Sequence, residues 1–163
     1  MRPEVLLGSG LITLAIAGAL VQFVLVGLLG MILLPVGFLL LTFGMLAARV
    51  PSVPPQQARR GAITGFLGVL LITAAAFKAG SLAYATAIHR IHAGSVESGS
   101  APADWLLGLG LAVLAAVFIG LGLRLRADWP PVRALRWSLA SLAVFPGAVA
   151  LFFLLALWQP YSA

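Results

Sequence analysis

The fold is decided by residues 5–48, VLLGSGLITLAIAGALVQFVLVGLLGMILLPVGFLLLTFGMLAA, a stretch of 44 positions without a charged side chain. A single α-helix of that length would extend about 66 Å, whereas the hydrocarbon core of a bilayer is about 30 Å thick. Two antiparallel helices of about 20 residues each would fit that core. The stretch therefore predicts a membrane hairpin with helices at residues 5–24 and 28–48, which reverses at Gly27 and Gly30 because glycine permits tight turns.

The whole chain has a membrane-like composition. Of its 163 residues, 62% are hydrophobic and 9% are charged, and its mean hydropathy is +1.12. A water-soluble domain carries about 25% charged residues, which it needs for a charged shell. The composition predicts one all-α integral membrane domain covering residues 1–163.

Three more apolar segments bring the predicted number of transmembrane helices to five. They lie at residues 61–92, 105–126 and 133–158. Proline and charged residues precede the first and the last of these segments, and such residues interrupt helices. Asp104 is the expected N-cap of the fourth helix, and Pro146 is expected to kink the fifth.

Eight of the nine arginines predict the orientation of this bundle. With five spans they all fall on one side of the membrane, and the connection on the other side contains Arg90 alone among the arginines. By the positive-inside rule the amino terminus is cytoplasmic and the carboxyl terminus lies outside. The eight are interpreted as topology signals at the lipid headgroups, with a specific anionic-lipid site as the alternative. They are Arg2, Arg49, Arg59, Arg60, Arg124, Arg126, Arg133 and Arg136.

The net charge of +6 could also suit a nucleic-acid partner. Here the bases flank apolar segments, so no nucleic-acid partner is expected. The preference for arginine over lysine is typical of a GC-rich prokaryotic genome. We therefore expect a multi-pass protein of a prokaryotic cytoplasmic membrane.

Two connections on the predicted cytoplasmic side resemble each other. Residues 44–60 and 122–136 each contain arginines, then a Pro-Pro pair, then further arginines. One interpretation is a weak duplication in which residues 28–92 and 105–158 are parallel repeats. The other is convergence, because any cytoplasmic connection needs helix breakers and arginine.

Small residues recur at spacings that place them on one face of a helix. The stripes comprise Gly108, Ala112, Ala116 and Gly120 in the fourth helix and Gly61 and Gly65 in the third. Such stripes let two helix backbones approach closely in lipid. We interpret them as packing surfaces within this chain, with a dimerisation surface as the alternative.

Lys78 starts a polar stripe on the third helix. Ser81, His89 and His92 follow at offsets of 3, 11 and 14 residues, which share one side of the helix. The stripe could contact a partner or a ligand. The alternative is that Lys78 extends its side chain to the nearer membrane surface.

Metal, cofactor and catalytic sites are not expected. The chain has no cysteine, and no recognised metal-binding spacing links His89 and His92 to Glu97 or Asp104. Every acidic residue falls at a predicted boundary or loop, which disfavours proton translocation by this chain alone. An enzymatic role is therefore not favoured.

The expected function is that of an accessory or scaffold subunit of a larger energy-transducing or transport complex. Short loops and small-residue helix faces favour a protein that acts by helix–helix contact. Its expected partners are membrane lipids and other membrane-protein subunits. The alternatives are a small oligomeric transporter or channel component, favoured by Pro35 and Pro146 within helices, and a membrane enzyme or haem-binding subunit.

Overall fold

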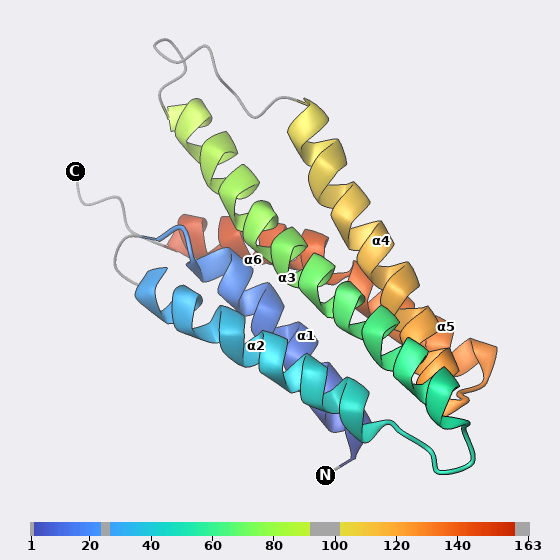
Figure 1. Ribbon diagram of the computed structural model, residues 1–163. Coiled ribbons are helices and arrows are strands. Elements are labelled where there is room, and N and C mark those ends of the chain that lie inside the picture. The colour runs from blue at the N-terminus through green and yellow to red at the C-terminus, as the bar shows by residue number, and fades with distance from the viewer. Residues whose placement is uncertain (1, 24–26, 92–101, 159–163) are drawn as a thin grey trace.

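The computed structural model describes residues 2–23, 27–91 and 102–158, whose regular structure is entirely α-helical (Figure 1). Within these residues, five segments are long and apolar enough to cross a membrane, with the last two helices forming one of them. This confirms the predicted all-α arrangement of five apolar helices. The helices are α1 (Pro3–Leu20), α2 (Gly27–Ala47), α3 (Pro55–Ile91), α4 (Pro102–Ala127), α5 (Pro131–Leu142) and α6 (Val144–Trp158).

The outer surface of the bundle is apolar. Leu28, Leu106 and Leu157 are 72%, 69% and 82% exposed, and many other large apolar side chains are also exposed. Among the described residues, the one fully buried polar side chain is that of Ser141, which donates to the Ser138 carbonyl. A surface of this kind is compatible with a multi-pass membrane protein surrounded by hydrocarbon.

α1 and α2 form an antiparallel hairpin whose register is set by glycines. Three glycines of α2 lie at seven-residue intervals. Gly37 faces Leu14 and Gly44 faces Leu7 on α1, and Gly30 faces Val21, the residue after α1. A Cβ atom at Gly37 would lie 2.9 Å from Leu14 Cγ, closer than side chains pack. Because these glycines have no side chain, Leu14 and Leu7 of α1 pack directly against the backbone of α2.

α3 and α4 form a second hairpin with a close backbone contact. A Cβ atom at Gly122 would lie 2.6 Å from Gly65 Cα, and one at Gly68 would lie 2.8 Å from the Ile119 nitrogen. The hairpin is long, because α3 contains 37 residues and so extends about 55 Å. The two hairpins cross where Gly80 on α3 meets the carbonyl oxygen of Gly18 on α1.

The last span is divided at Ala143 into α5 and α6. Pro146 lacks an N–H group, and its ring excludes a regular helical position for the carbonyl of Leu142, where α5 ends. The predicted kink is present and falls one turn before the proline. Because of this break, α5 packs against α4, whereas α6 crosses to α1 and α3 (Figure 1).

Three arginine-bearing segments meet at one end of the bundle, called the arginine end below. Figure 1 shows the amino-terminal end of α1, the α2–α3 connection and the α4–α5 connection there. Arg126 Nη2, at the end of α4, donates to the Leu46 carbonyl on α2 at 3.0 Å. Arg133 on α5 pairs with Glu4 on α1. The two arginine-rich connections therefore lie at the same end of the bundle (Figure 1).

The prediction that the chain reverses at Gly30 is wrong, because Gly30 lies inside α2. Gly27 is the first residue of α2, and α1 ends at Leu20. A Cβ atom at Gly30 would lie 2.6 Å from the Val21 nitrogen. Gly30 therefore allows α2 to approach the end of α1, and does not turn the chain.

The prediction that Asp104 caps α4 is also wrong. α4 begins at Pro102, so Asp104 lies inside the first turn. Likewise α3 begins at Pro55, six residues before the predicted start at residue 61. Proline is favoured at the first position of a helix, where its missing N–H would have no partner. Both prolines therefore begin helices.

Candidate functional site

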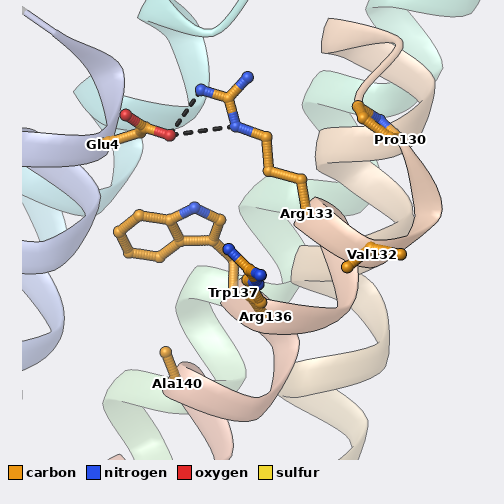
Figure 2. Close-up of a pocket in the computed structure, with 7 residues that line it drawn as sticks. All are labelled: Glu4, Pro130, Val132, Arg133, Arg136, Trp137 and Ala140. Carbon is orange, nitrogen blue, oxygen red and sulfur yellow. Dashed lines mark hydrogen bonds and ion pairs between the residues drawn. The ribbon is translucent and has the colours of Figure 1, made fainter.

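A groove between α1 and α5 opens at the arginine end. α1 packs along α2 and α6, while α5 is held mainly by α4, so α1 and α5 stay apart. The outer part of this groove encloses about 660 Å³ (Figure 2). Its lining comes from α1, from α5 and from the residue that precedes α5: Glu4, Pro130, Val132, Arg133, Arg136, Trp137 and Ala140.

An ion pair spans the mouth of the groove. Arg133 Nε and Nη2 both donate to Glu4 Oε1, at 3.0 and 2.5 Å (Figure 2). The guanidinium carbon of Arg133 also lies 4.2 Å from the centre of the Trp129 ring, a cation–π contact. Because both side chains of the pair are more than 40% exposed, its net stabilisation is about 0–1 kcal/mol. Its main effect is to fix the direction of the Arg133 side chain.

Inward from the ion pair the groove becomes apolar. A second hollow of about 340 Å³ shares Trp137 and Ala140 with the first, so the two form one continuous groove. Figure 2 shows the Trp137 ring reaching from α5 toward α1 between the ion pair and Ala140. The inner hollow is otherwise lined by Gly8, Leu11, Ile12 and Ala15 on α1 and by Ala143 and Val144.

The groove mouth carries positive charge that no described carboxylate compensates. Arg136 is exposed, and within residues 2–23, 27–91 and 102–158 no acidic side chain lies at ion-pair distance from it. Glu4 and Asp128 are the acids at this end, against eight arginines. The groove therefore combines a cationic mouth with an apolar interior.

Arg126 is predicted to contact lipid headgroups, but its side chain donates to backbone carbonyls of this chain. Its Nη1 and Nη2 donate to the carbonyls of Ala58 on α3 and Leu46 on α2, at 3.3 and 3.0 Å. Leu46 lies in the last turn of α2, where carbonyls have no partner within the helix. Arg126 thus joins the ends of three helices. Its Nε is buried without a partner in the described part of the chain.

The predicted polar stripe on α3 contacts two different neighbours. Lys78 Nζ donates to Asp104 Oδ1 on α4 at 2.7 Å. Ser81 Oγ accepts from Gln22 Nε2, just after α1, at 3.0 Å. The two residues therefore contact different parts of the bundle. His92 and the side chain of His89 lie outside what the structure describes, so their part of the stripe stays a prediction.

The predicted small-residue stripes contact other residues of this chain. Gly108 faces Phe145 on α6, Gly120 faces Ser138 on α5, and Gly61 faces Gly122. Gly65 faces both Met45 and Gly122. Ala112 and Ala116 are buried. These contacts agree with packing inside the chain.

A separate surface hollow, distinct from the α1–α5 groove, lies between α4 and α6, away from the arginine end. It encloses about 590 Å³, and its walls are almost entirely apolar. It forms where α6 diverges from α4 after the break at Ala143. Its lining residues are Pro102, Trp105, Leu106 and Leu109 on α4 and Phe145 and Pro146 on α6.

The remaining predicted arginines lie on the surface. The exposed arginines among them, as a headgroup contact requires, are Arg2, Arg49, Arg59, Arg60 and Arg124. Among the described residues, no three His, Cys, Asp or Glu side chains gather as a metal site would need.

Sequence reasoning missed Glu4 and Trp137 as members of a site. One signal was present, because Arg133, Arg136, Trp137 and Ala140 have the spacing of one helix face. Nothing in the sequence indicated that α1 would provide the facing wall. Comparisons with protein-family models, with curated proteins and with solved structures find no match to this chain.

Proposed function

We propose that this chain is a multi-pass protein of a prokaryotic cytoplasmic membrane that serves as an accessory subunit of a larger membrane complex. The arginine end faces the cytoplasm and the carboxyl terminus lies outside, in accordance with the positive-inside rule. The subunit acts by lateral contact between its own helices and an apolar helix of a partner subunit.

The proposal is carried by two glycines that serve no internal packing. Of the sixteen glycines in the described residues, fourteen have another part of this chain within 4 Å of where a Cβ atom would be. Gly110 and Gly147 have nothing there. A glycine inside a helix costs about 0.5–1 kcal/mol relative to alanine, and in lipid it permits close approach of another helix.

Both glycines are near the hollow between α4 and α6. Gly110 follows Leu109, and Gly147 follows Pro146, which both line that hollow. Leu106 and Leu109 beside it are 69% and 46% exposed. The hollow offers an apolar recess, and the adjacent glycines offer bare backbone, which together suit a transmembrane helix more than a polar ligand.

Replacement of these glycines tests the proposal without disturbing the core. Gly110→Leu and Gly147→Leu are expected to fold like the parent chain because their Cβ atoms meet no internal atom. In the native membrane, each variant should lose stoichiometric partner chains that the tagged parent retains in mild detergent. Ala74→Leu provides the matched control, since Ala74 is exposed on α3.

The outcomes separate the alternatives. Recovery of the active parent as a single chain, or partner retention by all three variants, would overturn the proposal. If the retained chain is a differently tagged second copy, the contact is a homo-oligomer. Substrate flux through vesicles that contain this chain alone would instead favour the transporter alternative.

A further inference from the structure

We infer that the α1–α5 groove is a binding site for one anionic phospholipid, with the headgroup phosphate at Arg136 and an acyl chain between Trp137 and α1. This inference is independent of the proposed partner contact, which lies on α4 and α6. The α1–α5 groove is required neither by the positive-inside rule nor by packing within the chain, and the inference gives it a ligand.

The mouth of the groove has donors suited to a phosphate. Arg136 has no acidic partner in the described residues, and it lines the outer hollow. Arg133 uses Nε and Nη2 for Glu4, which leaves Nη1 available. The indole N–H of Trp137 makes no hydrogen bond in the part of the chain that the structure describes. Arginine recognises phosphate through several parallel N–H donors, so these groups fit a headgroup.

Glu4 also lines this mouth and would repel a phosphate if it were unpaired. Its carboxylate instead accepts two hydrogen bonds from Arg133, so the pair is close to neutral. The charge that remains is that of Arg136. One positive charge matches the single negative charge of a phosphodiester lipid such as phosphatidylglycerol.

The length of the groove fits an acyl chain. From Glu4 to Ala15, α1 rises about 17 Å, and the hydrocarbon of one leaflet is about 15 Å deep. The lining changes over that distance from charged residues to Gly8, Leu11 and Ile12. A soluble phosphate would use only the mouth, whereas a lipid would fill both parts.

Native mass spectrometry of the full chain in detergent tests the site. The probes are phosphatidylglycerol and phosphatidylcholine with identical acyl chains, and glycerol phosphate. The parent chain should retain one phosphatidylglycerol in clear preference to phosphatidylcholine, and glycerol phosphate should not displace it. Arg136→Gln should weaken phosphatidylglycerol binding about tenfold, the loss expected for a charge-assisted contact. Arg59→Gln makes the same charge change at an exposed arginine outside the groove and should not weaken it.

A second variant tests the acyl part separately. Ala140 is exposed and lines both parts of the groove, so Ala140→Phe should fill it without disturbing the core. This variant should fold normally and lose phosphatidylglycerol retention. Equal weakening by Arg136→Gln and Arg59→Gln, equal retention of both lipids, displacement by glycerol phosphate, or unchanged retention by Ala140→Phe would each overturn the inference.

Discussion

Lys78 on α3 pairs with Asp104 on α4 at 2.7 Å and so joins the two helices of the second hairpin away from the arginine end. The backbone contact of Gly65 with Gly122 sets the register of these antiparallel helices and places Lys78 about one helical turn nearer the arginine end than Asp104. The lysine side chain therefore extends along α3 toward the carboxylate. Both interpretations of Lys78, a functional stripe and extension to the membrane surface, stay predictions beside this ion pair.

The pair should contribute modestly to stability, because the two side chains are 30% and 42% exposed. A double-mutant cycle with Lys78→Met and Asp104→Leu should give a coupling free energy of about 0.5–1 kcal/mol. Thermal unfolding of the four proteins in detergent would measure it. A coupling free energy of zero would mean that the contact does not hold α3 to α4.

Gly37 should tolerate no side chain. Gly37→Ala pushes a methyl group against Leu14 and should destabilise the protein by about 1–3 kcal/mol. Gly110→Ala adds the same methyl group where no internal atom lies, so it should be neutral or stabilise by up to about 1 kcal/mol. Thermal unfolding would compare them, and equal losses of stability would contradict the α1–α2 register.

Arg126 and Arg124 differ in role although they occupy the same helical turn. Arg126→Met removes the donors to the Leu46 and Ala58 carbonyls and should cost about 1–3 kcal/mol of unfolding free energy. Arg124 is exposed, so Arg124→Met should change stability by less than about 0.5 kcal/mol. Chemical unfolding in detergent would measure both. If Arg124→Met were the more damaging change, Arg126 would not join these helix ends.

The sequence was enough to predict five apolar helical segments long enough to span a membrane, because an uncharged run of known length can cross a bilayer only a fixed number of times. It did not give the helix boundaries. Pro55 and Pro102 fall in connections between the predicted helices, yet each begins a helix in the structure. The two roles of proline use the same missing N–H and differ only in whether a helix lies before or after the residue.

The contacts between helices could be predicted only where one helix follows the next in the chain. The glycines of α2 at seven-residue spacing lie on one helix face, and the partner of that face is the adjacent α1. The α1–α5 groove joins segments about 130 residues apart, as the Glu4–Arg133 pair shows. No periodicity within one helix encodes that pairing, because it depends on the break at Ala143 that sends α6 away from α4.

Single-cysteine labelling in membranes tests the central claim most directly, since the chain has no native cysteine. Ser52 lies in the α2–α3 connection, Ala103 in the first turn of α4, and Leu114 on the exposed face of α4. With an impermeant maleimide, Ser52→Cys should react only from the cytoplasmic side, Ala103→Cys only from outside, and Leu114→Cys from neither. Labelling of Leu114→Cys from water, or of Ser52→Cys in intact cells, would contradict a membrane bundle whose arginine end faces the cytoplasm.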